Sequence, residues 1–432
     1  MNIKTVAIIG ANGTMGSNIS GIFASFGNAK VYMISRDIEK SKEAAVKAVK
    51  SVRADSISCN LIPADYSMLE DCIESSDLVF ESVAENIKIK SDITKKIAAN
   101  LRSDAVACSG TSGLSITALS KIFPEHLRRN YLGVHLYNPP YNMTLCEIIP
   151  TEYTNKVLLD NMKKYLSDVL FRTVVEVKDY PAFIGNRIGF HFINSALQFA
   201  EKYKHNGGID YIDAILGPFT GRSMAPLVTS DFVGLDVHKA IVDNIYNNAK
   251  DYDNEVFVLP EFVKKLINEN KLGRKTKGGL YRIETNESGL KQLTVYDIIT
   301  GTYREKINYN FPFVEQMISY IRTGEYNSAF ETLINNRSVE AEICLNFLLN
   351  YIVYSLYISL AVGHDIYAAD DVMATGFNWC PPLALIDAFS AVTDFKKLVH
   401  ERIPESFKET EFVFPNIKTS RYDYRPYFKS IK

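Results

Sequence analysis

Three glycines near the N-terminus constrain the fold more than any other feature. The apolar run Val6-Ala7-Ile8-Ile9 leads into Gly10-Ala11-Asn12-Gly13-Thr14-Met15-Gly16, and a helical pattern follows. Glycines at this junction let the backbone approach a phosphate, and the helix N-terminus offers N–H groups to it. A tight turn alone would need the same glycines, but the position between a strand and a helix favours a dinucleotide. The predicted cofactor-binding residues are Gly10, Gly13, Thr14, Met15 and Gly16.

The end of the second predicted strand leaves the choice between NAD and NADP open. Residues 31–34 lead into Ser35-Arg36 rather than into an acid. An Asp or Glu there would bind the ribose 2′-hydroxyl of NAD, whereas an arginine accommodates the 2′-phosphate of NADP. Alternatively, Arg36 is a solvated charge and Asp37 binds the ribose. Ser35 and Arg36 are both predicted cofactor-binding residues.

Short apolar runs alternate with amphipathic stretches up to about residue 180, which predicts strand-helix-strand units and a parallel sheet. The predicted strands cover residues 4–9, 30–35, 77–82, 105–109, 130–135, 144–149 and 172–177. From Ile188 onward, apolar residues recur near the helical period. We therefore predict an α/β Rossmann-like N-terminal domain followed by all-α C-terminal domains.

Two stretches of the helical region resemble each other and predict tandem helical repeats. Residues 186–241 and 346–398 share the order helix, acidic turn, glycine-containing loop and helix. Between them, residues 288–303 predict a small hairpin. The predicted domains are 1–182 for dinucleotide binding, 183–282 for a first helical domain, 283–340 for a connector with the hairpin, and 341–432 for a second helical repeat.

His135 and Glu147 form a candidate catalytic pair. His135 ends one predicted strand, and Glu147 lies within the apolar run of the next, after a turn at residues 138–140. Strands joined this way can lie side by side, and a buried carboxylate needs a partner. An imidazole can take the proton of an alcohol near neutral pH while a hydride leaves the same carbon. A lone histidine on a strand is more often structural, so spacing alone leaves that alternative open.

Ser112 and Asn186 are further candidates, each with a structural alternative. Ser112 follows the predicted strand at 105–109, at the sheet edge where such folds bind ligands. It either hydrogen-bonds a substrate oxygen or caps the helix that begins near Ile116. Asn186 lies where the predicted sheet domain is followed by the predicted helices. It either reaches the substrate-binding cleft or caps the helix that begins there.

Composition excludes several classes of function. The 48 Lys and Arg residues nearly balance the 50 Asp and Glu residues, so we predict no binding to nucleic acid or to a membrane surface. The six cysteines show neither disulfide nor metal spacing, so we predict reduced core thiols and no metal site. We expect no segment of the ~20 apolar residues that span a bilayer, no signal peptide, and a cytoplasmic location.

Several ordered motifs resemble the 3-hydroxyacyl-CoA dehydrogenase family over nearly the whole chain. They lie at residues 76–86, 111–112, 133–139, 145–147, 183–187, 231–236 and 272–281. Residues 376–382 resemble the second copy found in two-repeat members of that family. No enoyl-CoA hydratase domain is expected within these 432 residues.

The resemblance implies reversible hydride transfer between C3 of a 3-hydroxyacyl-CoA and a nicotinamide cofactor, by family default NAD, in fatty-acid metabolism and β-oxidation. It implies His135 as general base, Glu147 as its orienting partner, and Ser112 with Asn186 as the groups that hold the reacting oxygen. Glu85 matches a family acid near the nicotinamide. The implied partner is an acyl-CoA, and apolar faces such as residues 347–349 predict either a contact between repeats or a homodimer.

The sequence departs from the family pattern at three places. One extra residue separates the first two glycines, Ser35 replaces an acid, and Gly110-Thr111-Ser112-Gly113 replaces N-T-S-S. The alternatives are a related dehydrogenase redirected to another hydroxy acid or a carrier-protein thioester, and a catalytically silent nucleotide-binding protein. The joint presence of His135, Glu147, Ser112 and Asn186 favours an active enzyme.

Overall fold

The computed structural model describes residues 1–285, 289–403, 414 and 416–429. The chain divides into two compact units. Unit 1 comprises Met1–Phe183 and Val362–His364, and unit 2 comprises Ile184–Ala361 and Asp365–Lys432. The N-terminal α/β sheet domain followed by a largely helical region was predicted correctly.

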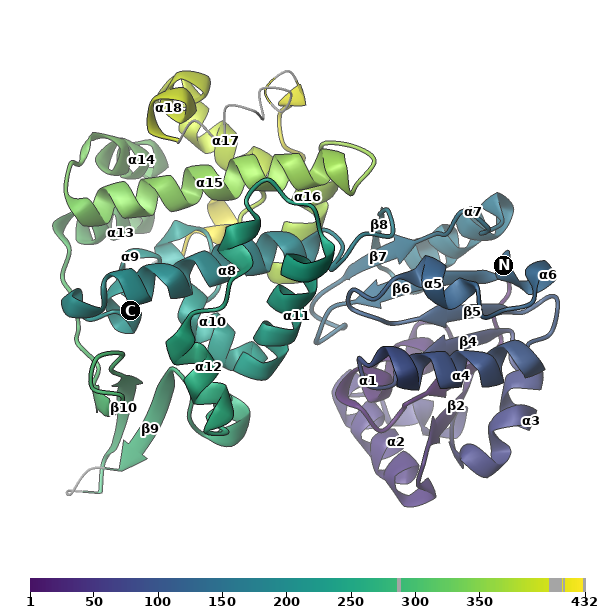
Figure 1. Ribbon diagram of the computed structural model, residues 1–432. Helices are drawn as coiled ribbons and strands as arrows, with labels where there is room; N and C mark the ends of the chain where they lie inside the picture. The colour runs from purple at the N-terminus through teal and green to yellow at the C-terminus, as the bar shows by residue number, and fades with distance from the viewer. Residues whose placement is uncertain (286–288, 404–413, 415, 430–432) are drawn as a thin grey trace. The chain divides into compact units, whose positions relative to one another are not determined.

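Unit 1 contains an eight-stranded sheet with strand order β3-β2-β1-β4-β5-β6-β7-β8 (Figure 1). The strands are β1 (Thr5–Ile9), β2 (Lys30–Ser35), β3 (Leu61–Asp65), β4 (Leu78–Glu81), β5 (Val106–Ser109), β6 (Tyr131–Leu136), β7 (Leu145–Ile149) and β8 (Thr173–Glu176). Seven were predicted from the sequence. The eighth, β3, was missed because Pro63 interrupts a short run, and a proline is tolerated there because β3 is an edge strand.

The prediction of a parallel sheet is right for β1 to β6 and wrong for the last two strands. β7 pairs with β6 in the antiparallel sense, and β8 is parallel to β7. The connection from β6 to β7 is a short loop without a crossover helix, and such a connection returns the chain antiparallel.

Helices flank the sheet of unit 1 (Figure 1). They are α1 (Thr14–Ser25), α2 (Ile38–Val52), α3 (Leu69–Glu74), α4 (Ile87–Asn100), α5 (Ile116–Ser120), α6 (Glu125–Arg128) and α7 (Lys156–Lys164). Val6 and Ile8 of β1 pack in one cluster with α1, α2 and α7, while the alternate residues Ala7 and Ile9 are also fully buried. Because successive side chains of a strand point to opposite faces, both faces of the sheet are covered.

Unit 2 is mainly helical. Its helices are α8 (Gly185–Lys202), α9 (Ile209–Ile215), α10 (Pro226–Val233), α11 (Leu235–Asn248), α12 (Glu261–Asn268), α13 (Pro312–Thr323), α14 (Tyr326–Asn335), α15 (Val339–Ala361), α16 (Ala368–Val372), α17 (Pro382–Ser390) and α18 (Phe395–Arg402). An antiparallel sheet of β9 (Tyr281–Thr285), β10 (Lys291–Tyr296) and β11 (Tyr303–Glu305) interrupts them. The segment predicted as a hairpin, residues 288–303, includes β10 and the first residue of β11 but does not include β9. Its first residue, Ser288, lies outside the described residues.

The same contact occurs at the start of two helices in unit 2. The carboxylate of Asp213 on α9 accepts a hydrogen bond from the Leu227 N–H of α10 at 2.8 Å. The carboxylate of Asp370 on α16 accepts one from the Leu383 N–H of α17, also at 2.8 Å. In both cases the donor follows the proline that begins the helix, and a carboxylate there satisfies an N–H without an intrahelical partner. This contact supports the predicted similarity of the two stretches, while the domain boundaries stay a prediction.

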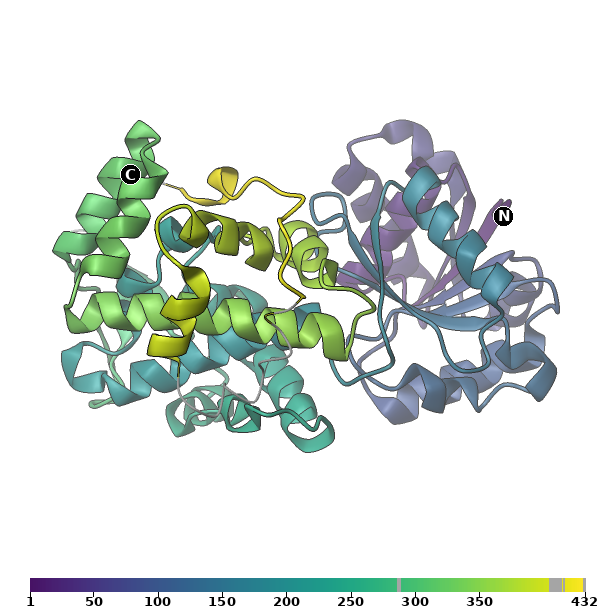
Figure 2. The ribbon, with the colours of Figure 1, turned by 90° about the horizontal axis from the view of Figure 1, so that it is seen from above.

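Helix α15 corrects the expectation that no segment is apolar and long enough to cross a membrane. By length and composition it passes that test, and 78% of its most apolar stretch is buried inside the fold. It packs against α8, α9, α14, α16 and α17, as a core helix does, and Figure 2 shows its light green ribbon among other helices of unit 2. Its apolar residues 347–349 are buried there, so they make the contact within the chain that was one of the two predicted uses.

One cysteine also differs from expectation. Cys59 is exposed, whereas the five other cysteines are buried free thiols. Cys59 lies in a short 3₁₀ turn, Asp55–Asn60, which precedes the edge strand β3 rather than a core element.

His238 is the buried centre of a hydrogen-bond network in unit 2. Its Nε2 lies 2.9 Å from Asn194 Oδ1, and its Nδ1 lies 3.1 Å from Ser230 Oγ. Asn194 uses its amide N–H groups to reach the Val256 and Val258 carbonyls, so its oxygen accepts from His238 Nε2–H. Burial lowers the pKa of His238 from 6.5 to about 3.

We expect His238 to contribute a fall in the free energy of unfolding as the pH is lowered from about 6.5 toward 3, because the unfolded chain takes up a proton that the buried imidazole does not. The variant His238→Gln can still donate to Asn194 but does not titrate, so its free energy of unfolding should rise relative to that of the wild-type protein as the pH is lowered. Urea unfolding followed by circular dichroism at several pH values measures both slopes.

The exposed His126 provides the control. His126→Gln should retain the slope of the wild-type protein. Equal slopes for the wild-type protein and His238→Gln would contradict the assignment of a neutral buried imidazole.

Candidate active site

The glycine loop of unit 1 is held against the end of β4. Gly10 has φ +90°, and a Cβ there would lie 2.5 Å from the carbonyl oxygen of Ser82. A Cβ on Gly16 would lie 2.3 Å from the carbonyl oxygen of Gly10. Packing therefore requires both glycines. Gly13 is the N-cap of α1, and a Cβ there would meet only the Gly10 carbonyl oxygen, at 3.4 Å, so its missing side chain serves close approach from outside.

A cavity of about 730 Å³ opens beside this loop. That volume is typical of sites for small molecules and cofactors. Its walls come from the ends of β1, β2, β4 and β5 and from α4. The predicted site residues that line it are Gly10, Gly13, Thr14, Met15, Ser35, Arg36, Glu85 and Ser112. Gly16 instead packs beneath the loop.

His135 and Glu147 face each other across β6 and β7. They are directly opposite in the antiparallel register, and His135 Nδ1 lies 2.8 Å from Glu147 Oε2. Both side chains are buried. Because an ionised carboxylate only accepts hydrogen bonds, His135 carries its proton on Nδ1, and Nε2 is the basic nitrogen. The structure thus brings together the pair that spacing suggested.

Tyr137 is a neighbour of this pair that the sequence analysis missed. Its hydroxyl donates to Glu147 Oε2 at 2.8 Å. Strand alternation offered a signal, since Tyr137 is two residues from His135 and directly follows the end of β6, so an extended chain points both side chains to the same side. His135 and Tyr137 thus both contact Glu147 Oε2 and hold the carboxylate in place behind the imidazole.

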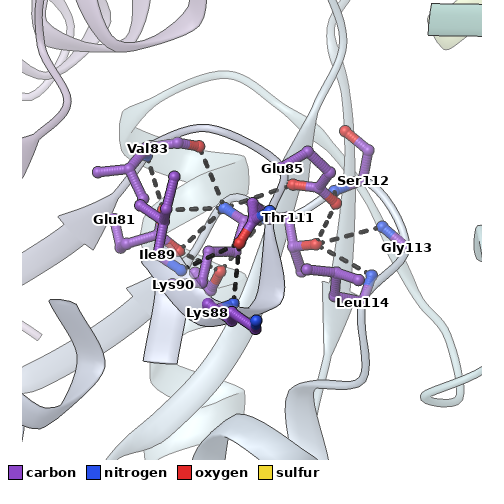
Figure 3. Close-up of polar contacts among 12 residues, drawn as sticks. Glu81, Val83, Glu85, Lys88, Ile89, Lys90, Thr111, Ser112, Gly113 and Leu114 are labelled. Carbon is purple, nitrogen blue, oxygen red and sulfur yellow. Dashed lines mark hydrogen bonds and ion pairs between the residues drawn. The ribbon is translucent and has the colours of Figure 1, made fainter. Parts of the chain in front are cut away.

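Glu85 was predicted as a site residue, but its contact with Glu81 and Lys90 was missed, and these three residues are here called the carboxylate–lysine cluster (Figure 3). Lys90 Nζ lies 2.8 Å from Glu81 Oε1 and 3.4 Å from Glu85 Oε2. The Glu81 and Lys90 side chains are each only 1% exposed. The Ser109 hydroxyl donates to Glu81 Oε2 at 2.6 Å, which ties the ends of β4 and β5 together. A charged residue at the end of an apolar strand was the available signal, because it needs a buried partner.

The cluster extends to the loop that carries Ser112. Glu85 Oε1 accepts a hydrogen bond from Ser112 N–H at 2.9 Å and another from the Thr111 hydroxyl (Figure 3). Gly110, which departs from the family pattern, is closed in, because a Cβ there would lie 2.7 Å from the Phe80 ring. The neighbouring aromatic ring leaves no room for a larger side chain at that position.

The alternative that Ser112 caps the following helix is wrong. Helix α5 is capped by Ser115, whose side chain accepts from the Ala118 N–H. The Asp179 carboxylate accepts from the Ile116 and Thr117 N–H groups. Ser112 therefore does not satisfy the start of this helix and lines the cavity instead.

Asn186 lies in unit 2, in the first turn of α8. The N-cap of that helix is Ile184, so Asn186 does not occupy the cap position. The next residue, Arg187, forms a buried ion pair with Asp251 at 2.6 Å. The Tyr354 hydroxyl donates to the same Asp251 oxygen at 2.6 Å. This network anchors the turn that carries Asn186.

Within the described ranges, no group of three or more His, Cys, Asp or Glu side chains is arranged to hold a metal ion. The polar groups of unit 1 are instead arranged as a proton-accepting imidazole and a cavity with a helix N-terminus at its base. This arrangement fits a dinucleotide and a substrate that loses a proton.

Two family models match the chain. Residues 5–180 match the 3-hydroxyacyl-CoA dehydrogenase, NAD binding domain, and residues 183–283 match the 3-hydroxyacyl-CoA dehydrogenase, C-terminal domain. Among curated proteins, a probable 3-hydroxyacyl-CoA dehydrogenase of Bacillus subtilis is 27% identical over 425 residues, which is 92% of this chain and 52% of that protein. The chain thus spans about half the length of this relative.

A shorter relative and a solved structure extend the comparison. A 3-hydroxybutyryl-CoA dehydrogenase of Clostridioides difficile is 31% identical over 292 residues, which is 64% of this chain and 98% of that protein. The crystal structure of 3-hydroxybutyryl-CoA dehydrogenase from Escherichia coli has a TM-score of 0.69 at 19% identity, covering 96% of this chain and 98% of that one. This second similarity supports the fold alone.

The burial of the carboxylate–lysine cluster leads to a prediction about the free energy of unfolding. We expect Lys90→Met to lower the free energy of unfolding by about 3–5 kcal/mol, because it leaves the Glu81 carboxylate buried without its partner. Lys88→Met is the matched control, since it removes the same charge from an exposed position on α4. Urea unfolding of the two variants measures the difference. Equal stability of both would show that the Glu81–Lys90 contact contributes little.

Proposed function

Because the chain belongs to the 3-hydroxyacyl-CoA dehydrogenase family, we propose that it catalyses reversible hydride transfer between C3 of a 3-hydroxyacyl-CoA and a nicotinamide cofactor. The observation that carries this proposal is the buried pair of His135 and Glu147, 2.8 Å apart on neighbouring strands. It supplies an oriented base of the kind that oxidation of an alcohol requires. The match to an NAD-binding domain over residues 5–180 supports the cofactor class.

The residues around the cavity fit such a cofactor. Gly13 opens the backbone to a pyrophosphate, and the first turn of α1 presents N–H groups to it. Thr14 and Met15 lie in that turn and line the cavity. A nicotinamide bound here would supply the acceptor for the hydride that leaves C3. Glu85, held by Lys90 and by the 111–112 loop, would be the acid near that ring, as the family resemblance implies.

In the oxidation direction His135 Nε2 takes the proton of the C3 hydroxyl as the carbon becomes a ketone. Glu147 keeps the Nδ1 proton in place and stabilises the imidazolium that forms. In the reverse direction the same nitrogen returns the proton to the oxygen. The family resemblance supports the proposal that Ser112 and Asn186 hold that oxygen.

A second candidate is a related dehydrogenase redirected to another hydroxy acid or to a carrier-protein thioester. Gly110 favours it, because the Phe80 ring leaves no space there for the amide side chain typical of the family. A catalytically silent nucleotide-binding protein is the least supported reading, since such a protein would not need the buried pair.

We propose fatty-acid β-oxidation as the metabolic context, an acyl-CoA as the small-molecule partner, and the cytoplasm as the compartment. Homodimer formation remains a prediction without an identified surface, because the apolar face first considered for it is buried within unit 2.

The test is reduction of acetoacetyl-CoA at neutral pH, with NADH and with NADPH, followed by the absorbance of the reduced nicotinamide. We expect His135→Gln to lower kcat about 10²- to 10⁴-fold, the range of a general base, while cofactor affinity stays close to that of the wild-type protein. His126→Gln, at an exposed histidine, should leave kcat unchanged.

Full activity of His135→Gln would remove this residue from the mechanism. No turnover with either cofactor, in a wild-type protein that still binds nucleotide, would favour the redirected or the silent protein.

A further inference from the structure

We infer that the cavity of unit 1 is built at its adenosine end for a ribose 2′-phosphate, so that the chain prefers NADP(H) to NAD(H), with Arg36 as the specificity-determining residue. The inference rests on the proposed function only in taking the ligand of this cavity to be a nicotinamide dinucleotide. The family match names an NAD-binding domain, so the inference concerns how this member differs.

The first observation is the end of β2, where folds of this type place the acid that binds the ribose 2′-hydroxyl. Here that position is Ser35, which is 1% exposed. Its hydroxyl donates to the Asp37 carbonyl oxygen at 2.7 Å and lies 2.8 Å from Ser41 Oγ. The Ser35 side chain is thus engaged by the backbone turn and by α2, and it contributes no negative charge to the cavity.

The second observation weighs against the alternative that Asp37 binds the ribose. Asp37 is the N-cap of α2, and its side chain accepts a hydrogen bond from the Glu39 N–H at 2.9 Å. It is not one of the described residues that line the cavity. Capping explains the aspartate at this position, because a carboxylate there satisfies an orphan N–H of the helix.

The third observation is that Arg36, which stands between these two residues, lines the cavity together with Tyr66 and Lys96. Lys96 Nζ lies 5.6 Å from the centre of the Tyr66 ring. Burial raises the pKa of the Tyr66 phenol, and the positive charge of Arg36 opposes that rise. Two cations therefore line the same cavity as this tyrosine.

These two cations are available to a ligand. In the part of the chain that the structure describes, neither Arg36 nor Lys96 forms an ion pair with a carboxylate, and both are exposed. The two carboxylates that line the cavity are engaged by other lysines. Glu85 contacts Lys90 at 3.4 Å, and Asp92 contacts Lys95 at 3.2 Å.

The charge of the 2′-phosphate explains why this arrangement should favour NADPH over NADH. A 2′-phosphate is a dianion or monoanion near neutral pH, and an arginine binds two of its oxygens with parallel N–H groups. The 2′-hydroxyl of NAD finds no carboxylate to accept its hydrogen bond at the end of β2. We expect NADPH to bind about 10- to 100-fold more tightly than NADH, with a preference that weakens at high ionic strength.

The experiment titrates the full chain with NADPH and with NADH in the absence of any acyl-CoA, following nicotinamide fluorescence at one ionic strength. Competition by adenosine 2′,5′-bisphosphate and by adenosine 5′-monophosphate isolates the effect of the 2′-phosphate. Arg36→Gln should weaken NADPH binding about tenfold or more and leave NADH binding nearly unchanged. Lys40→Gln, at an exposed lysine on α2 that does not line the cavity, should leave both affinities unchanged.

Tighter binding of NADH than of NADPH by the wild-type protein would overturn the inference, and so would an Arg36→Gln variant that loses affinity equally for both. Because no acyl substrate is present, the outcome is independent of turnover. A protein that prefers NADPH but does not reduce acetoacetyl-CoA would refute the proposed reaction and leave the cofactor preference standing.

Discussion

The antiparallel pairing of β7 with β6 is the constraint on which the proposed chemistry depends. A parallel arrangement would require a long crossover between the two strands, and His135 and Glu147 are only 12 residues apart. The short return brings the carboxylate directly opposite the imidazole, while both remain buried in the sheet. The apolar residues around Glu147 strengthen its interaction with His135, and the Tyr137 hydroxyl holds the same oxygen.

The carboxylate–lysine cluster gives the cavity of unit 1 its rigid wall. Glu81 and Lys90 are buried together, and their contacts join the end of β4 to α4 and, through Ser109, to β5. Glu85 carries the same network to Ser112. The residue proposed to lie near the nicotinamide and the residue proposed to hold the substrate oxygen therefore share one support. A buried charge pair of this kind contributes position more than net stability, because desolvation offsets much of its attraction.

Some elements of the fold could be predicted from sequence patterns and others could not, and individual residues explain the difference. Seven of the eight strands of the sheet in unit 1 could be predicted from apolar runs, since the sequence of a strand buried on both faces is a continuous apolar run. β3 was not predicted because Pro63 interrupts its apolar run. Helix α15 was misjudged because isolated polar residues hide how apolar it is, and only its burial identifies it as a core helix. Ser112 and Ser115 both suit a helix cap by composition, and the backbone alone assigns that role to Ser115.

The sequence by itself determined the glycine loop, the order of the elements and the family, because these depend on local periodicity and on residues close together in the chain. The tertiary structure alone decided which charges meet. Lys90 pairs with Glu81 rather than with solvent, Arg36 lines the cavity, and Asp37 caps a helix instead. These outcomes depend on backbone direction and on neighbours from other strands, which no pattern along one segment records.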